Sequence, residues 1–473
     1  MTTAASPLPV AARRRLLSPE LGVSVAAFAA LCVAVLTRSA QLLEPDDLAY
    51  RASIVALTHG HITLSNVQYT ALARQLGSIA QWVQLPSGSW ISEKNPGFPF
   101  FAAPFQLLGI LRAAPLFYGA LGCIGLYLGG RRWLGRFGGT AAVVLFCASG
   151  AALVFAWRAT MPTFTDASLI AAGTGALLWA MLATDATTRR RTVVGLLGFL
   201  ALDAAVSIRY TNAVILLVAL VSVTLARRAA GLPRRALAWW LGSVGVLVAL
   251  VAAFDLHYYG GVLKTGYGTG VITFGLSAVW PNVQAMPYHL VKSMPLLLLG
   301  LAAMGWIAIR AARSLRSGLA AATRSAWRRD AAVGAALAAS WLGIFGLYSA
   351  YDWTVNQAGM HDLTVHVVRF YVPALGAVAL LASWFLTRLP RVVSLAGLAT
   401  LAVLAVITFP GLAGGGMGGP GGPGMPGGGP PGGALPSGQV PGGPPPGAPT
   451  LPSGQAPSGT APPGGTQPPG ASP

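Results

Sequence analysis

Long apolar runs recur along most of the chain and set its fold class. Each run holds about 20 mostly apolar residues, enough for one helix to cross the hydrocarbon core of a bilayer. A helix also satisfies its own backbone groups there. We place eleven such runs near residues 21–37, 113–130, 139–157, 168–183, 193–208, 212–226, 238–254, 293–309, 331–349, 370–387 and 392–409. The pattern predicts an all-α, polytopic membrane protein.

Composition agrees with a membrane environment. The 473 residues are 54% hydrophobic and 9% charged, and ordinary soluble domains carry about 25% charged residues. The net charge of +19 does not indicate nucleic acid as a partner, because most of the basic residues fall in alternate loops. By the positive-inside rule those loops face the cytoplasm. They contain Arg13–Arg15, Arg131, Arg132, Arg136, Arg189–Arg191, Arg227, Arg228, Arg234, Arg235, Arg310, Arg313, Arg316, Arg324, Arg328, Arg329, Arg388 and Arg391.

The same rule divides the chain into parts. Residues 1–20 are expected in the cytoplasm and residues 21–409 in a transmembrane domain. That domain has three outer segments, at 38–112, 255–292 and 350–369. Residues 410–473 are dominated by Gly and Pro and contain no Lys, Arg, Asp or Glu. Such a composition predicts a disordered tail, which an odd number of spans places outside the cell.

The first outer segment has its own apolar pattern. Val67, Leu72, Leu76, Ile79 and Val83 recur every three to five residues. This spacing predicts one helix with an apolar stripe, too polar to span and so expected to lie along the membrane surface. The stretch at 96–105, which holds four Phe and three Pro residues, is expected to be a second interfacial segment.

Two adjacent carboxylates open this outer segment. Asp46 and Asp47 follow Pro45, just after the first span. An ionised carboxylate within hydrogen-bond reach of an alcohol can act as its general base, and a neighbouring carboxylate can orient it or hold the alcohol. The alternative is a plain helix start, because Asp in the first turn complements the helix dipole.

A single lysine follows in the same outer segment. Lys94 lies beside the aromatic stretch that begins at Phe98. Its ammonium is suited to a lipid phosphate at the membrane surface. The alternative is that the side chain only extends from the apolar layer toward water.

The order of these features resembles the first outer loop of GT-C glycosyltransferases. The shared features are Pro45-Asp46-Asp47 with Tyr50 three residues on, and then Glu93-Lys94-Asn95-Pro96. The similarity is greatest to the protein mannosyltransferase and aminoarabinose transferase branch. Asp47 stands where that branch usually has Glu, and Asn95 and Gly97 interrupt its Lys-Pro-Pro run.

Further motifs extend the resemblance to about residues 20–410. Arg158 to Asp166 resembles the second outer loop of the family, and Arg209-Tyr210-Thr211 closes the fifth predicted span at the same level. Tyr258-Tyr259-Gly260-Gly261 and Lys264 to Gly268 resemble a Tyr- and Gly-containing family pattern but lack its Phe and Pro. The stretch from His366 to Pro373, which includes Arg369, resembles the entry to a late span.

The resemblance implies a function and a site. It implies transfer of a sugar from a polyprenyl-phosphate donor to a glycan, lipid or protein hydroxyl at the outer face, with inversion at the anomeric carbon. Asp46 would be the base, and Lys94, Arg209 and Arg369 would neutralise the departing phosphate. For each arginine the alternative is anchoring at the membrane edge. The other substrate-binding candidates are Asp47, Arg158, Asp166 and Tyr267.

Metal dependence and two other functions remain open at this stage. Asp46, Asp47 and Asp166 offer oxygen atoms of the kind that divalent cations prefer, although no spacing requires a metal. One rival is a transporter or flippase, which usually carries ionisable residues near the midplane. Among the predicted spans, only Asp203 suits that role. The other rival is an inactive scaffold with a GT-C-like fold.

Overall fold

The protein is described here from a computed structural model. The structure describes residues 18–39, 45–77, 79–262, 264–267, 273–316, 321–358 and 364–414. The chain divides into two units, Met1–Gly422 and Pro423–Pro473, and all described residues belong to the first unit. Residues 415–473 of the predicted disordered tail and residues 1–17 of the predicted cytoplasmic segment therefore lie outside the described residues, whereas residues 410–414, predicted as the start of the tail, form the end of a helix.

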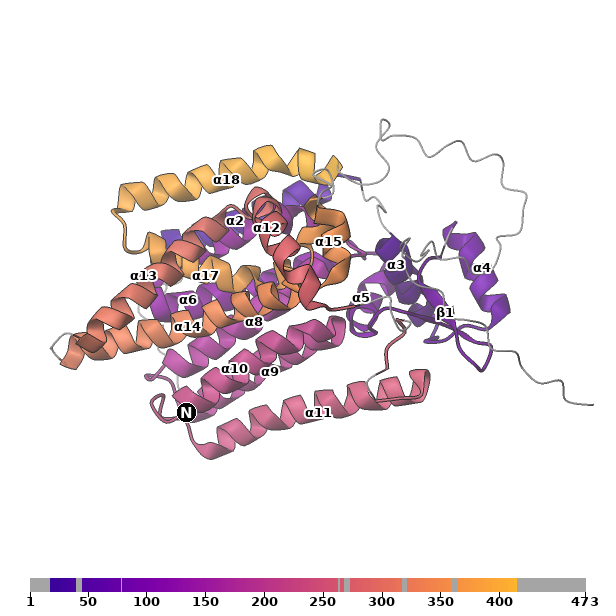
Figure 1. The fold of residues 1–473 in the computed structure, drawn as a ribbon, viewed down its shortest axis with the longest axis horizontal. Coiled ribbons are helices and arrows are strands. Elements are labelled where there is room, and N and C mark those ends of the chain that lie inside the picture. The colour runs from indigo at the N-terminus through magenta and orange to yellow at the C-terminus, as the bar shows by residue number, and fades with distance from the viewer. Residues whose placement is uncertain are drawn as a thin grey trace, which may run out of the picture. The chain divides into compact units, whose positions relative to one another are not determined.

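Helices dominate the described part of the chain (Figure 1). The helices are α2 (Pro19–Leu36), α3 (Pro45–Thr58), α4 (Asn66–Leu76), α5 (Gly97–Leu107), α6 (Ala113–Cys147), α7 (Gly150–Trp157), α8 (Thr163–Leu182), α9 (Thr188–Ile208), η1 (Tyr210–Asn212), α10 (Ala213–Ala226), α11 (Arg234–Tyr259), α12 (Leu276–Ser293), α13 (Leu296–Arg316), α14 (Ala321–Ser349), α15 (Asp352–Ala358), α16 (Thr364–Val368), η3 (Val372–Ala374), α17 (Leu375–Leu386) and α18 (Arg391–Gly414). Two short strands, β1 (Trp82–Gln84) and β2 (Trp90–Ser92), pair antiparallel.

The predicted fold class is confirmed. Among the described residues, eight helices are long and apolar enough to cross a membrane, namely α2, α6, α8, α9, α11, α13, α14 and α18. Two shorter apolar stretches, at 210–226 and 372–386, contain α10 and α17. All eleven predicted spans fall on these helices or on α7. The protein is a multi-pass, all-α membrane protein.

Helix α6 accounts for two of the predicted spans, because it doubles back on itself. Gly135 has φ 79° and ψ −177°, which is not helical and is accessible mainly to glycine. The two arms then pack closely, since a Cβ at Gly139 would lie 2.6 Å from the carbonyl oxygen of Tyr127. Gly135 therefore forms the turn of a helical hairpin.

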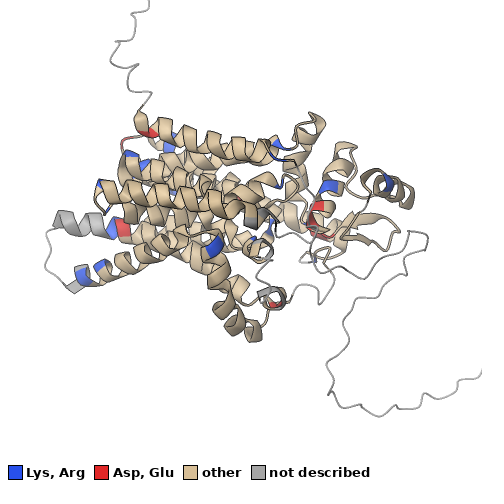
Figure 2. Cartoon of the chain, turned by 90° about the horizontal axis from the view of Figure 1, so that it is seen from above, with Lys and Arg blue, Asp and Glu red and all other residues tan. Residues whose placement is uncertain are grey.

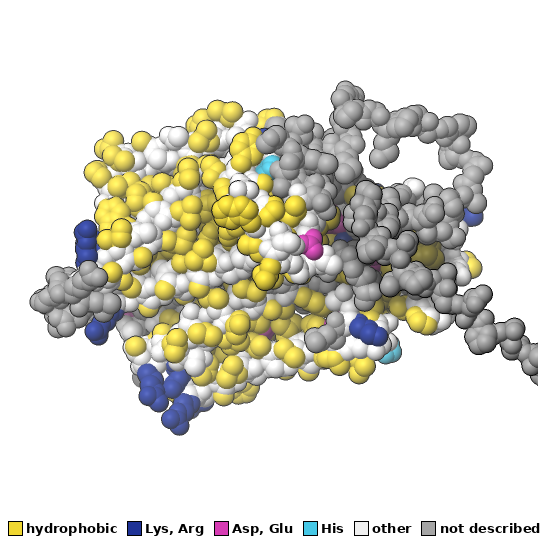
Figure 3. Space-filling model, in the orientation of Figure 1, with side chains coloured by type: hydrophobic (Ala, Val, Ile, Leu, Met, Phe, Trp, Pro, Cys, Tyr) yellow, Lys and Arg dark blue, Asp and Glu magenta, His cyan; other side chains and the backbone are white. Residues whose placement is uncertain are grey.

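The helices of the bundle differ in how much of their surface is buried. In the interior, α6 and α8 cross at glycines so closely that a Cβ at Gly175 would lie 2.1 Å from the Gly125 oxygen. Small residues at helix crossings permit such close packing in membranes. On the outside, α11 and α18 present exposed apolar side chains such as Val246 and Val406. Figure 3 shows this hydrophobic surface between the ends of the bundle.

Basic side chains gather at one end of the bundle. Figures 2 and 3 show them at the left end. At this end Arg132 lies 2.8 Å from Asp185, and Arg388 lies 2.7 Å from Asp330. The Asp330 carboxylate also accepts hydrogen bonds from the indoles of Trp133 and Trp384. The segments α3, α4, α5 and the β1–β2 hairpin lie at the opposite end (Figure 1).

The prediction of a single surface helix over residues 67–83 is wrong in the length of the helix. Helix α4 ends at Leu76, because Gly77 takes a left-handed conformation (φ 79°) that caps it. Val83 lies instead in β1, opposite Ile91 of β2. Val67 is exposed and Leu72 is buried, so a helix of eleven residues carries only part of the expected stripe.

Candidate active site

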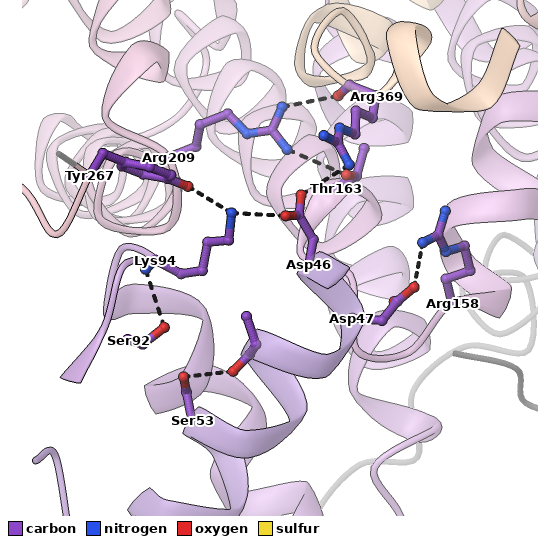
Figure 4. A network of polar contacts seen from close by, with 11 residues as sticks. Asp46, Asp47, Ser53, Ser92, Lys94, Arg158, Thr163, Arg209, Tyr267 and Arg369 are labelled. Atoms are coloured by element: carbon purple, nitrogen blue, oxygen red, sulfur yellow. Dashed lines mark hydrogen bonds and ion pairs between the residues drawn. The ribbon is translucent and has the colours of Figure 1, made fainter. Parts of the chain in front are cut away.

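Helix α3 presents the two candidate carboxylates at its first turn. It begins at Pro45, which is pre-organised for a first helical position, and Asp46 and Asp47 complement its dipole. Consecutive helical residues point in different directions. The two acids therefore reach different surroundings, as Figure 4 shows. A place in the first turn of α3 therefore does not prevent the two carboxylates from making further contacts.

Lys94 reaches the same place from the turn between β2 and α5. Its backbone N–H donates to Ser92 Oγ at 3.2 Å. The turn is held by a close contact at Gly97, where a Cβ would lie 2.3 Å from Ser207 Oγ and 2.5 Å from the Ser207 carbonyl carbon. Only glycine permits this approach of α5 to α9. The glycine that interrupts the Lys-Pro-Pro run of the family therefore has a packing role here.

Asp46 is paired through both carboxylate oxygens. Its Oδ1 lies 2.8 Å from Lys94 Nζ, and its Oδ2 lies 2.9 Å from Arg369 Nη1 (Figure 4). The Asp46 side chain is 16% exposed, and those of Lys94 and Arg369 are 5% and 11% exposed. Charge-assisted hydrogen bonds of this kind are short and strong. Two cations thus converge on one partly accessible carboxylate.

Neighbouring groups fix the two cations. Lys94 Nζ donates to the Tyr267 hydroxyl at 2.9 Å and also lies 4.9 Å from the centre of the Tyr267 ring. The Arg369 guanidinium lies 5.1 Å from the ring centre of Trp353 and 4.9 Å from that of Phe370. Such stacking is available to a planar guanidinium and not to an ammonium.

Arg209 brings a third cation to the site. It follows the last residue of α9 in extended conformation, and its Nη1 donates to the Arg369 carbonyl at 3.0 Å. Its Nε lies 3.5 Å from Asp166 Oδ2. Asp166, at the first turn of α8, also accepts a hydrogen bond from Asn212. Asp166 therefore acts on the site through Arg209.

Asp47 and Arg158 form a separate buried pair. Arg158 Nη2 donates to Asp47 Oδ2, and Thr160 Oγ1 donates to Asp47 Oδ1 at 2.9 Å. Both side chains of the ion pair are almost fully buried, at 0% and 2% exposed. This pair ties the start of α3 to the segment between α7 and α8.

A cavity of about 1140 Å³ opens beside Asp46. Five of the eight sequence-predicted site residues line it: Asp46, Lys94, Arg209, Tyr267 and Arg369. The other three, Asp47, Arg158 and Asp166, lie behind its wall. Aromatic side chains form much of the lining and include Tyr50, Tyr258, Tyr259, Tyr348, Tyr351, Trp353 and Phe370. The cavity is thus lined by cations beside Asp46 and by aromatic rings, whose flat faces suit contact with sugar rings and lipid.

Burial shapes the ionisation of groups around the cavity. It raises the pKa of the Tyr267 hydroxyl, and the charge of Asp46 raises it further. Tyr267 therefore accepts from Lys94 as a neutral phenol. Burial also raises the pKa of Glu93, with the neighbouring Lys94 opposing the shift.

Several supporting residues carry little sequence signal. Thr160 and Asn212 are polar residues at helix ends, where capping is the usual explanation, and their partners are distant in sequence. Tyr210 donates to Asp255 at 3.2 Å, and Tyr259 donates to the Ser92 carbonyl at 3.0 Å. These two contacts hold the end of α11 against the site.

The carboxylates do not come together as a metal site. Within the described ranges, no three His, Cys, Asp or Glu side chains are grouped so that they could hold a metal ion. Asp46, Asp47 and Asp166 each pair with different cations. The described residues therefore do not fit a divalent cation held by these three acids.

Comparisons with known proteins identify the fold. No protein-family model and no curated protein matches the chain. Among solved structures, apo ArnT from Cupriavidus metallidurans is 17% identical over 82% of this chain and 64% of that chain, with a TM-score of 0.50. ArnT bound to undecaprenyl phosphate is 16% identical, over 81% and 63% (TM-score 0.48). The apo oligosaccharyltransferase from Archaeoglobus fulgidus is 11% identical, over 83% and 55% (TM-score 0.47).

The chain thus spans less than two thirds of the length of ArnT. The similarity concerns the fold and agrees with the resemblance between the sequence motifs. The fold of this protein is similar to that of ArnT.

Proposed function

We propose that the protein is a glycosyltransferase that moves a sugar from a polyprenyl-phosphate donor to an acceptor hydroxyl. One observation carries the proposal: in a large cavity at one end of the bundle, a partly exposed carboxylate, Asp46, lies between Lys94 and Arg369. This arrangement supplies a base and an anion site within one side chain's length of each other. The ArnT-like fold supports the same class of reaction.

The proposed reaction is a single displacement. The acceptor oxygen attacks the anomeric carbon and gives its proton to Asp46. The bond between the anomeric carbon and the phosphate oxygen breaks, and its electron pair leaves with the polyprenyl phosphate. Lys94, Arg369 and Arg209 stabilise the negative charge that develops on that oxygen. Attack from the face opposite the phosphate inverts the anomeric carbon.

Cations outnumber carboxylates around Asp46. Lys94, Arg209 and Arg369 pair with two carboxylates, Asp46 and Asp166, and Lys264 also lines the cavity. This excess of positive charge suits the negative charge of a sugar that is linked through a phosphodiester to a polyprenol. The cavity, at about 1140 Å³, is also larger than the roughly 300–1,000 Å³ typical of small-ligand sites. It has room for a sugar together with part of an acceptor.

We place this site at the outer face of the membrane. Basic loops occupy the end of the bundle opposite the site, and the positive-inside rule assigns such an end to the cytoplasm. The acceptor would then be an envelope glycan, lipid or protein.

The rival transporter function has less support. Asp203, the one acid that suggested it, is buried in α9 and does not line the cavity. Transport sites near the midplane usually gather ionisable residues, whereas the charges that line this cavity lie at helix ends and in loops.

Transfer from a panel of radiolabelled polyprenyl-phosphate sugars tests the proposal. Membranes with the wild-type protein, the Asp46→Ala variant or no added protein are compared. We expect the wild type alone to label a glycan, lipid or protein from one donor of the panel. Equal labelling in all three membranes would overturn the proposal and favour the transporter or the inactive scaffold.

A further inference from the structure

The cations suited to the donor phosphate are already paired with the proposed base. Lys94 Nζ and Arg369 Nη1 each contact a different oxygen of Asp46, at 2.8 and 2.9 Å. A phosphate that accepts from the same N–H groups of both cations must occupy the position of that carboxylate, because these groups are directed at it. The carboxylate and the phosphate therefore compete for one anion site.

This relationship has a consequence for the reaction, and it rests on the proposed function. We infer that the donor phosphate displaces Asp46 from Lys94 and Arg369, and that this displacement frees the carboxylate to act as the base. While Asp46 is paired with both cations, its two oxygens accept from Lys94 and Arg369 rather than from an acceptor hydroxyl. Donor binding thus activates the base, and the donor binds before the acceptor reacts.

The surroundings allow the exchange without movement of the helices. Lys94 Nζ is held by the Tyr267 hydroxyl and Arg369 by the faces of Trp353 and Phe370. These contacts keep both cations at the cavity when the carboxylate leaves. Asp46 is the first acid of α3 and lines the cavity itself, so a change of its side-chain rotamer moves it from the cations toward an acceptor. The buried Asp47–Arg158 pair meanwhile holds the start of α3 in place.

Binding of undecaprenyl phosphate to the full chain in lipid nanodiscs tests this inference without requiring turnover. We expect Asp46→Asn and Asp46→Ala to bind it about tenfold or more tightly than the wild type, since loss of the competing charge releases two charge-assisted contacts. The matched control is Asp185→Asn, which removes a carboxylate that pairs with Arg132 at the opposite end of the bundle. Its affinity should stay at the wild-type value. Undecaprenol, which lacks the phosphate, should bind all four proteins equally.

Each outcome decides a different point. Equal or weaker binding by both Asp46 variants, with a wild type that binds, overturns the exchange and leaves the proposed function standing. Equal tightening by Asp185→Asn also overturns it, because the loss of any carboxylate would then have the same effect. Failure of every protein to bind would overturn the donor class itself. Thermal unfolding of each variant establishes that the comparison is made between folded proteins.

Discussion

Arg369 Nη1 lies 2.9 Å from Asp46 Oδ2. This ion pair joins the first helix after α2 to the segment before α17, at opposite ends of the membrane domain's sequence. Lys94 contacts the other oxygen of Asp46. The segments that contain Asp46, Lys94 and Arg369 therefore meet at this carboxylate. The proposed chemistry depends on that convergence.

The Arg369 guanidinium should be sensitive even to replacement by lysine. Lysine keeps the charge but loses the stacking on Trp353 and Phe370 and the fixed direction of the N–H groups. We expect Arg369→Lys to lower kcat/KM for transfer by about tenfold to a hundredfold, the value of one charge-assisted hydrogen bond. Arg388→Lys is the control, since Arg388 makes its ion pair at the opposite end of the bundle. Equal effects of the two changes on transfer would contradict the prediction.

The Asp47–Arg158 pair should contribute to stability rather than to substrate binding. Removing one partner of a buried ion pair costs about 3–5 kcal/mol because it leaves the other charge unpaired. We expect Asp47→Asn and Arg158→Met each to lower the thermal unfolding temperature in detergent. The double variant should lose less than the sum of the two losses. Unchanged unfolding temperatures together with a raised KM would show instead that these residues bind substrate.

Gly97 should tolerate no side chain. A Cβ there would meet both the side chain and the backbone of Ser207, and overpacking of this kind costs about 1–3 kcal/mol. Gly97→Ala should therefore lower both thermal stability and transfer. A shift of α5 would also move the preceding turn, which contains Lys94, away from Asp46. Gly245→Ala on α11 is the control, since a Cβ at Gly245 has no heavy atom within 4 Å. Unaltered stability of Gly97→Ala would rule out this close approach.

The raised pKa of Glu93 predicts how the stability of the protein depends on pH. Burial raises the pKa of its carboxyl in the folded protein, so the folded state favours the protonated form. Its contribution to stability is present in acid and is lost as pH rises through the folded-state pKa. Glu93→Gln should therefore raise the free energy of unfolding at pH 7 by less than about 1 kcal/mol for this half-exposed group, which is measured as a higher unfolding temperature. The gain should vanish near pH 4. A gain of the same size at both pH values would contradict the assignment.

Hydropathy predicted the membrane helices because the period and length of apolar runs are local properties of the sequence. The turn inside α6 lies at Gly135, within a basic loop that already separated two runs. The prediction of one helix over 67–83 was wrong because the apolar periodicity continues past Gly77, whose left-handed conformation ends α4. The β1–β2 hairpin beyond it contains only three residues in each strand, too few for an alternating pattern to be recognised.

The site was partly predictable for a similar reason. The motifs around Asp46 and Lys94 are local, and they indicated groups that the structure brings together. The sequence could not predict that Asp46 and Asp47 have different partners. Adjacent helical side chains point in different directions, but which neighbours each one reaches depends on how the helix is packed. The partners of Asp47 are Arg158 and Thr160, which lie more than a hundred positions away. Pairing over such distances is a property of the packed bundle.

Turnover of the purified Asp46→Asn protein with its donor tests the central claim most directly. A general base contributes about 10²- to 10⁴-fold to the rate. We therefore predict a fall in kcat of that size, measured as release of polyprenyl phosphate coupled to labelling of the acceptor, for a variant that thermal unfolding shows to be folded. Asp185→Asn, which alters a carboxylate at the opposite end of the bundle, should turn over at the wild-type rate. Transfer by Asp46→Asn at the wild-type rate would contradict the role of Asp46 and with it the proposed mechanism.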